Sequence, residues 1–257
     1  MLRRIDWFWR LCMTGFAFAF LFGGGCVLAA TVLPILAVLP GNRRDRAQTV
    51  IRLNFRGYLF MLQRLGVLRL ELEGAERLRA SGGRIVIANH PSLLDVVILM
   101  ALIPRAQCIV KHQLWNSFML GGVMRQAGYI RNDLAPGALV GACRAALDEG
   151  QSLIIFPEGT RTRPGSPPLF RRGFANLATL AGASIQWVVI TCTPPTLVKG
   201  EPWWRIPRQK PLFRLVVGEC LDASTYLGYQ HRSIAARRLV GYLETLYAER
   251  LQGAGMG

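Results

Sequence analysis

The feature that most constrains this chain is an uncharged, apolar run of about thirty residues, from Leu11 to Leu39. Roughly twenty helical residues already cross the hydrocarbon core of a bilayer, so a run of this length predicts a membrane-embedded helical segment. We do not expect a secretory signal peptide, because its apolar region is about half as long and ends at a cleavage site. The apolar run instead continues to Pro40. We therefore expect a membrane protein that is anchored through its N-terminal part.

Arginines flank this run on both sides and leave two membrane geometries open. They are Arg3, Arg4 and Arg10 before the run and Arg43, Arg44, Arg46, Arg52 and Arg56 after it. A simple crossing usually shows a charge bias between its two ends, whereas basic residues at both ends also fit a bent or re-entrant helix. The next segment, Thr49 to Leu68, mixes apolar residues with arginines, which is typical of a helix that lies along the interface. In either geometry we expect the rest of the chain to face the cytoplasm from the inner (cytoplasmic) membrane.

The net charge of +16 comes almost wholly from arginine, and 51% of the residues are hydrophobic. Such a charge excess favours an anionic partner, which is either lipid headgroups or nucleic acid. The sequence contains no zinc-finger spacing, no RNP-like aromatic segment and no basic tail. We therefore expect anionic membrane lipid as a partner and no nucleic acid.

The cysteines predict a reducing compartment. The six are Cys12, Cys26, Cys108, Cys143, Cys192 and Cys220. They are scattered, mostly within apolar stretches, and never form a Cys-x-x-Cys motif. We interpret them as small buried hydrophobic residues and not as disulfides or metal ligands.

Beyond the apolar run, strand and helix patterns alternate along the chain. Strands are predicted at 84–88, 106–110, 153–156, 185–192 and 212–217, and helices at 93–102, 114–126, 137–148, 174–180 and 234–251. This alternation predicts an α/β fold with a mixed, mostly parallel sheet flanked by helices. We divide the chain into membrane-anchoring helices at residues 1–70 and an α/β domain at residues 71–257.

The first candidate site follows the predicted strand at 85–87, in the stretch Asn89-His90-Pro91-Ser92-Leu93-Leu94-Asp95. Pro91 ends the strand, and Ser92 with Asp95 resembles a capping box that opens a helix. A neutral imidazole at the carboxyl end of a strand can take a proton from a hydroxyl if a carboxylate holds its other nitrogen. On one continuous helix the two side chains would lie about 140° apart, so their contact requires a turn that folds His90 back. The alternative is that Asp95 only caps backbone amides and that His90 is structural.

The second candidate site follows another predicted strand, at 152–156, and reads Pro157-Glu158-Gly159-Thr160-Arg161. A turn of this kind can present a carboxylate, backbone amides and a guanidinium together, which suits a phosphate or carboxylate ligand. An ordinary β-turn is the alternative. The sequence has no Gly-x-Ser-x-Gly elbow, which argues against a serine hydrolase. The histidines and acids lack metal-ligand spacing, so we expect no metal.

These two stretches, in this order, resemble the glycerolipid acyltransferases typified by lysophosphatidic acid (1-acylglycerol-3-phosphate) acyltransferase. Residues 89–95 are similar to the family's His-x-x-x-x-Asp block, and residues 156–161 are similar to its Phe-Pro-Glu-Gly-Thr block. Weaker similarities are residues 111–114 to Lys-x-Glu-Leu, 170–173 (Phe-Arg-Arg-Gly) to Phe-Lys-x-Gly, and 128–131 to the intervening Gly…Arg block. The resemblance covers about residues 80 to 220. The chain departs from the pattern at Gln113, at the shorter spacing around Arg131 and at Trp187, where the family usually has a proline.

The resemblance implies a membrane-bound O-acyltransferase that moves a fatty acyl group to the free hydroxyl of a lysophospholipid. The simplest reaction is the conversion of lysophosphatidic acid to phosphatidic acid. Acyl-CoA or acyl-carrier protein would be the donor substrate, and no cofactor is expected. In this reaction His90 is the general base, and Asp95 orients it.

The remaining candidate site residues would bind the substrates. Lys111 and Arg161, with Arg131 as a further candidate, would hold the acceptor phosphate by charge-assisted hydrogen bonds. Backbone amides near Gly159 and Thr160 are candidate donors to the developing oxyanion. By resemblance, Glu158 belongs to the acceptor site, where it would bind a glycerol hydroxyl or fix an arginine.

Two alternatives to this function stay open. The departures at 113, 131 and 187 favour the same chemistry on another acceptor, such as an amino-acid-containing lyso-lipid, or with a specialised acyl donor. A different class, a non-catalytic basic protein that binds anionic lipid or nucleic acid, predicts salt-sensitive binding without consumption of a thioester.

Overall fold

The five predicted strands and two further short ones form one sheet, and its seven described strands lie in the order β1-β7-β6-β2-β5-β3-β4. The computed structural model describes residues 2–80, 82–118, 120–162, 166–222 and 232–254. The strands are β1 (Arg69–Glu73), β2 (Arg84–Ala88), β3 (Ala106–Val110), β4 (Ile130–Arg131), β5 (Ser152–Ile155), β6 (Ser184–Thr193) and β7 (Leu212–Leu221). Only the β6–β7 pair is antiparallel among these neighbours. The predicted mixed, mostly parallel sheet is therefore confirmed.

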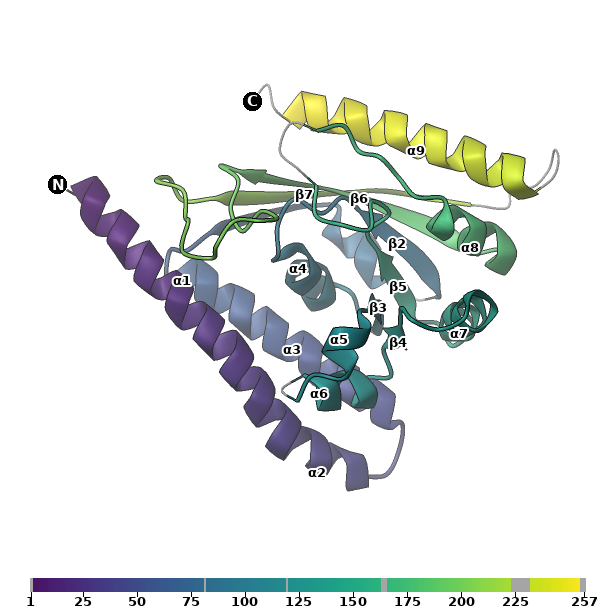
Figure 1. Ribbon diagram of the computed structural model, residues 1–257, viewed down its shortest axis with the longest axis horizontal. Coiled ribbons are helices and arrows are strands. Elements are labelled where there is room, and N and C mark those ends of the chain that lie inside the picture. Colours follow the sequence, from purple (N-terminus) through teal and green to yellow (C-terminus); the bar gives the residue numbers. More distant parts are fainter. Residues whose placement is uncertain (1, 81, 119, 163–165, 223–231, 255–257) are drawn as a thin grey trace.

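Helices cover both faces of the sheet (Figure 1). The elements α3 (Arg43–Arg64), α4 (Asp95–Leu102) and α6 (Gly121–Gln126) contribute to one hydrophobic cluster, and α7 (Pro136–Asp148), α8 (Gly173–Ala181) and α9 (Arg232–Ala254) contribute to the other. Successive side chains of β2 point to opposite faces, so Val86 joins the first cluster while Ile85 and Ile87 join the second. A central parallel strand is buried on both faces, which explains why it is apolar throughout.

The apolar N-terminal run forms one long helical element. It begins as α1 (Leu2–Val27), passes through a π-helical turn (Leu28–Val32) and ends as α2 (Leu33–Val38). Pro34 lacks an amide hydrogen and its ring crowds the carbonyl four residues earlier, so the wide π turn accommodates it without ending the helix. Among the described residues, the stretch Arg4–Leu36 is the one helix long and apolar enough to cross a membrane.

The chain reverses after α2, and α3 runs back beside α1 and α2 (Figure 1). One face of α3 packs on α4 and buries Ile51, Tyr58, Leu59 and Leu62. That face is therefore covered by protein, and only the opposite side of α3 is open to the interface predicted for residues 49–68. The predicted division at residue 70 stays a prediction; the first strand of the sheet begins at Arg69.

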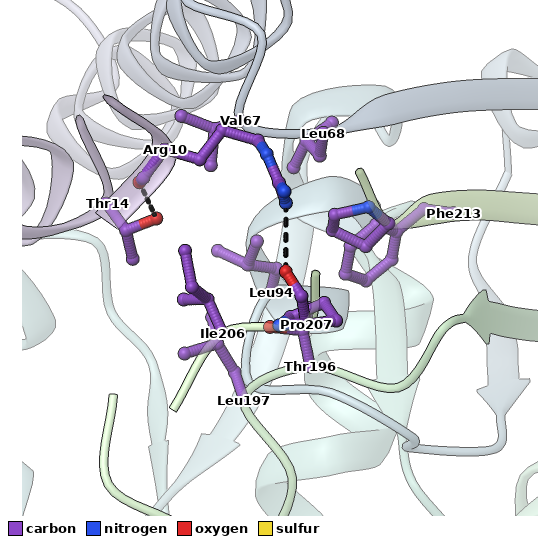
Figure 2. A pocket seen from close by; sticks show the side chains of 11 residues that line it. Arg10, Thr14, Val67, Leu68, Leu94, Thr196, Leu197, Ile206, Pro207 and Phe213 are labelled. Carbon is purple, nitrogen blue, oxygen red and sulfur yellow. Dashed lines mark hydrogen bonds between the residues drawn. The ribbon is translucent and has the colours of Figure 1, made fainter. Parts of the chain in front are cut away.

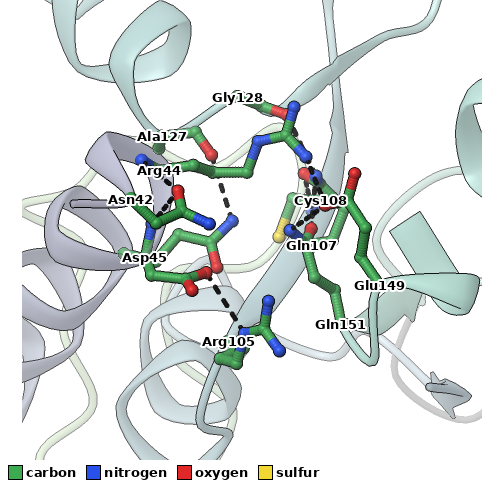
Figure 3. A network of polar contacts seen from close by, with 11 residues as sticks. Asn42, Arg44, Asp45, Arg105, Gln107, Cys108, Ala127, Gly128, Glu149 and Gln151 are labelled. Atoms are coloured by element: carbon green, nitrogen blue, oxygen red, sulfur yellow. Dashed lines mark hydrogen bonds and ion pairs between the residues drawn. The ribbon is translucent and has the colours of Figure 1, made fainter. Parts of the chain in front are cut away.

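A polar network fixes the start of α3 to the edge of the sheet (Figure 3). The Gln48 side chain donates to the carbonyl of Ala127 at 3.0 Å. Arg105 at the start of β3 pairs with Asp45 at 3.2 Å. The N-terminal half of α3 is thus held by directional bonds as well as by apolar packing.

Several elements differ from the sequence prediction. The short edge strands β1 and β4 were not predicted, because β1 alternates charged with apolar residues and is mostly exposed, and β4 has only two residues. The helix predicted at 114–126 is instead α5 (His112–Trp115) and α6. The chain turns between them, where the Ser117 hydroxyl accepts the Leu120 amide and Gly121 lies against the Trp115 carbonyl.

The prediction that the cysteines are buried is only partly correct. Cys108, Cys143 and Cys192 lie in the core, whereas Cys26 is half-buried and Cys12 and Cys220 are exposed. An exposed position on α1 is still compatible with an apolar environment, because most of the outer face of that helix is apolar.

Trp187, one of the departures from the family pattern, is a core residue on the side covered by α8 and α9. Its indole lies directly over Gly218 of the neighbouring strand β7, and a Cβ atom at 218 would come within 1.7 Å of the ring. The guanidinium of Arg250 in α9 covers the ring, 5.7 Å from the indole. Trp187 is therefore explained by packing against a glycine.

We predict that Gly218→Ala lowers the free energy of unfolding by about 1–3 kcal/mol, the usual cost of overpacking a core. Thermal unfolding in detergent would measure this change, and the loss should shrink when Trp187→Leu makes room. Gly241→Ala is the matched control, because Gly241 lies in α9 with no atom near its missing side chain. Equal losses at 218 with and without the tryptophan would contradict this packing.

Candidate active site

His90 and Asp95 meet across the turn that joins β2 to α4. His90 lies two residues beyond the end of β2, and Asp95 is the first residue of α4. The imidazole Nδ1 is 2.9 Å from Asp95 Oδ2, and the Ser92 amide donates to the same oxygen at 2.7 Å. The predicted turn that folds His90 back is therefore confirmed. Of the predicted capping box, the half in which Asp95 accepts the Ser92 amide is present.

The pair is buried unequally, which sets its electrostatics. The Asp95 side chain is fully buried, whereas 14% of the His90 side chain is exposed. Burial raises the pKa of Asp95 above its usual value, while the hydrogen bonds from His90 and Ser92 oppose that rise. When Asp95 is ionised, His90 Nδ1 carries the hydrogen and donates it to Oδ2. Nε2 then keeps its lone pair, and no hydrogen bond engages Nε2 within the described part of the chain.

The turn after β5 lies against the same histidine. Because β2 and β5 are parallel neighbours, their carboxyl ends share one edge of the sheet. The Thr162 amide donates to the His90 carbonyl at 2.7 Å, and the His90 amide donates back to the Thr162 hydroxyl at 3.0 Å. Phe156 stacks on the imidazole with ring centroids 4.1 Å apart. The two candidate stretches therefore form one structure.

Glu158 forms hydrogen bonds with both of these stretches. Its Oε1 accepts the Thr162 hydroxyl at 2.7 Å and also lies 3.4 Å from the His90 amide nitrogen. Burial raises the pKa of Glu158, and these two hydrogen bonds oppose the rise. Among the described residues, this oxygen contacts the His90 amide and the Thr162 hydroxyl and no arginine. A contact between Glu158 and an acceptor hydroxyl stays a prediction.

The amides at 159 and 160 differ in their availability. Gly159 has φ +70°, a backbone conformation that favours glycine, and its amide donates to the Phe156 carbonyl at 3.0 Å. This amide is engaged in the turn, and its service to an oxyanion stays a prediction. The Thr160 amide has no hydrogen-bond partner among the described residues and stays a candidate.

Arg171 is a cation of this corner that the sequence prediction did not select. Its amide donates to the Pro157 carbonyl at 2.8 Å, and its side chain passes the bare face of Gly159, where a Cβ atom would lie 3.0 Å from Nε. The available signal was its position in the 170–173 block that resembles Phe-Lys-x-Gly. Thr162 and Phe156 were also missed as partners of His90, and no spacing rule identifies them.

Arg161 binds backbone oxygens of the loop that follows β6. Its Nη1 donates to the Leu197 carbonyl at 2.9 Å and to the Val198 carbonyl at 3.2 Å. The side chain is half-buried, so part of its hydrogen-bonding capacity is already used. The phosphate contact expected of Arg161 stays a prediction.

Lys111 and Arg131 lie on strands farther from the histidine. Lys111 is exposed at the end of β3, two strands from β2. Arg131 lies on the edge strand β4, three strand spacings or about 14 Å from β2. Its Nε is 2.9 Å from Asp133 Oδ1, and this ion pair lowers the pKa of Asp133 to about 2. The structure thus pairs Arg131 with an acid and does not bring it to His90; its acceptor contact stays a prediction.

Fold and site together are those of an acyltransferase domain, and the family model described as "Acyltransferase" matches residues 69–191. Three curated relatives named 1-acyl-sn-glycerol-3-phosphate acyltransferase are similar to parts of this chain. The Helicobacter pylori (strain J99 / ATCC 700824) protein is 34% identical over 43% of this chain and 49% of its own length. The Cocos nucifera protein is 33% identical over 48% and 42%. The alpha form from Homo sapiens is 30% identical over 68% and 62%.

The matched family model and the names of these relatives support the lysophosphatidic acid acyltransferase family of glycerolipid acyltransferases. The matches span 42–62% of the length of the three relatives. The fold is also similar to the crystal structure of the 1-acyl-sn-glycerophosphate (LPA) acyltransferase PlsC from Thermotoga maritima. That similarity has a TM-score of 0.75 at 20% identity and covers 97% of this chain and 98% of the other.

The raised pKa of Glu158 predicts a pH-dependent difference between wild type and Glu158→Gln. The native protein holds this proton more tightly than the unfolded chain does, so wild type loses stability as the pH rises above about 4.5, the ordinary value for glutamate. The glutamine variant keeps an acceptor oxygen for Thr162 and does not titrate. Its stability relative to wild type should therefore increase between about pH 4 and pH 7, as measured by chemical denaturation. A difference that stays constant or falls with pH would contradict the burial of this carboxyl.

Proposed function

We propose that this protein is an O-acyltransferase that moves a fatty acyl group from a thioester to the free hydroxyl of lysophosphatidic acid. The observation that carries the proposal is the 2.9 Å contact between His90 Nδ1 and the buried Asp95, which leaves Nε2 to accept a proton. The turn that holds Glu158 and Thr160 lies against the same histidine. A base, an amide donor and nearby cations at one sheet edge are what acyl transfer to a phosphate-bearing acceptor requires.

The proposed reaction needs no covalent enzyme intermediate. His90 Nε2 takes the proton of the acceptor hydroxyl as its oxygen attacks the thioester carbonyl carbon. Negative charge on the carbonyl oxygen of the tetrahedral intermediate would be met by the Thr160 amide, and one well-placed donor contributes about 3 kcal/mol. The carbon–sulfur bond then breaks, and the imidazolium returns the proton to the leaving thiolate. Asp95 stabilises the imidazolium between these two steps.

The acceptor phosphate would be held by the cations at this edge of the sheet. The Arg171 side chain passes over the turn at Gly159. Arg161 follows the same turn, and Lys111 follows strand β3. Arg131 would take part only by exchanging Asp133 for the ligand. The names of the relatives support a 1-acylglycerol 3-phosphate acceptor for this chain. The donor is acyl-CoA or acyl-carrier protein.

We further propose that the protein works at the inner (cytoplasmic) membrane. The outer face of α1 and α2 exposes large apolar side chains, among them Phe8 at 62%, Phe16 at 50% and Ile35 at 61%. Such a surface is larger than soluble proteins usually leave in water, and lipid would cover it. The arginine excess suits anionic headgroups beside it.

Free-thiol release from acyl-CoA and from acyl-carrier protein, with each candidate acceptor in turn, tests the function. Wild type should release thiol with lysophosphatidic acid. His90→Ala should lower kcat/KM by at least about 10³-fold, and Asp95→Asn by about 10²- to 10⁴-fold, because the base is lost or misoriented. His112→Ala is the matched control, since that histidine is exposed and pairs with Asp133 at 2.9 Å.

The outcomes separate the alternatives. Thiol release that depends on another lyso-lipid keeps the chemistry and replaces the acceptor. Salt-sensitive lipid binding without thiol release from either donor supports the non-catalytic alternative. Full turnover of His90→Ala counts against the mechanism itself.

A further inference from the structure

Arg10 belongs to the arginines that flank the apolar run in the sequence, but the structure buries it completely, with 1% of the residue exposed. Its Nη1 donates to the carbonyls of Pro207 and Gln209 at 3.0 and 3.1 Å, and its Nη2 donates to the carbonyl of Arg208. Its Nε pairs with Asp6 at 3.0 Å. One side chain of α1 therefore satisfies three successive carbonyls of a distant loop. A planar guanidinium can do this because its five donors form a fixed fork.

That loop, residues 194–211 between β6 and β7, is here called the strap. Its far half, at residues 206–209, is bound by α1, since Trp7 Nε1 also donates to the Ile206 carbonyl at 3.3 Å. Its near half, at residues 197–198, is bound by residues of the candidate active site. The Leu197 carbonyl accepts Arg161 Nη1 at 2.9 Å and the Leu93 amide at 3.3 Å. The strap thus connects the anchor helix to both stretches that build the site.

Leu197 adopts a backbone conformation that is unfavourable for a non-glycine residue. Its φ is +53°, in the left-handed region that non-glycine residues rarely adopt. The contacts of the strap on both sides hold this residue in place. Loosening the far half of the strap should therefore release the carbonyl that holds Arg161.

A small cavity lies between α1, the strap and the turn after β2 (Figure 2). Arg10 and Thr14 from α1 line one side of a cavity of about 20 Å³, and Leu94 and Leu197 line the other. A cavity of this size holds about one water molecule, so it leaves little slack. A shift of α1 would therefore be passed on to Leu197 and to Leu94, which follows the residue whose amide binds the Leu197 carbonyl.

We propose that Arg10 is a positioning residue for acyl transfer, which ties the membrane-facing helix to the active site through the strap. The kinetic test of this proposal rests on the proposed function. Arg10 itself contacts no proposed reacting group. It sets the place of Arg161, and with it the site for the acceptor phosphate, and it leaves the His90–Asp95 pair intact.

Kinetics of Arg10→Gln, with lysophosphatidic acid in mixed micelles, give the first test. KM for the acceptor should rise by roughly 2- to 30-fold, the range for residues that act through a packed network, while KM for the acyl donor and the pH profile stay unchanged. Arg4→Gln is the matched control, because it removes the same charge from an exposed position of the same helix. Trp7→Phe removes one weaker hydrogen bond to the strap. It should therefore raise the acceptor KM by less than Arg10→Gln does. Equal changes in both KM values, or none beyond those of Arg4→Gln, overturn the proposal.

Hydrogen exchange gives a second test that does not need activity. The Leu93 amide should exchange faster in Arg10→Gln than in wild type or Arg4→Gln, because its acceptor is the Leu197 carbonyl. Unchanged exchange at residues 92–95 overturns the proposal even if the variant is less stable. Wild type without turnover on lysophosphatidic acid would refute the proposed function, and the exchange data would still decide the role of Arg10.

Discussion

The buried carboxylate of Asp95 is the constraint on which the rest of the site depends. A carboxylate removed from water is costly unless it is hydrogen-bonded. Here Oδ2 accepts both the Ser92 amide and His90 Nδ1, whereas Oδ1 has no hydrogen-bond partner among the described residues. These bonds fix the imidazole in one orientation, which separates the two ring nitrogens by role. Nδ1 is committed to the acid, and Nε2 is left for chemistry.

The surrounding fold makes that orientation rigid. Two adjacent parallel strands end at the same sheet edge, and the backbone of His90 exchanges hydrogen bonds with Thr162 of the neighbouring turn. Glu158 accepts a hydrogen bond from the His90 amide and another from the Thr162 hydroxyl. On the far side, α1 and the strap hold the carbonyl that binds Arg161. The site is thus held by four segments that are distant in the sequence, namely the turn after β2, the turn after β5, the strap and the apolar helix α1.

Much of this arrangement could be predicted from local pattern. The apolar β-branched runs gave the positions of the central strands, and proline and glycine marked the turns that carry His90 and Glu158. Tertiary bonds could not be predicted in this way. Arg161 looks from the sequence like a free phosphate ligand, yet it binds carbonyls 36 and 37 residues away in the chain. Arg10 looks like a membrane-flanking charge, yet the carbonyls that it binds lie almost two hundred residues away. The pairing of Trp187 with Gly218 depends likewise on the register of two antiparallel strands.

Nitrogen-15 NMR of histidine-labelled protein in detergent tests the central claim most directly, because the chain has only three histidines. The spectrum of His90→Gln assigns the resonances of His90 by difference. In the neutral wild-type protein we predict a hydrogen on Nδ1 and none on Nε2, and a loss of this preference in Asp95→Asn. A hydrogen on Nε2 in the wild type, or a tautomer that does not respond to Asp95→Asn, would contradict the account.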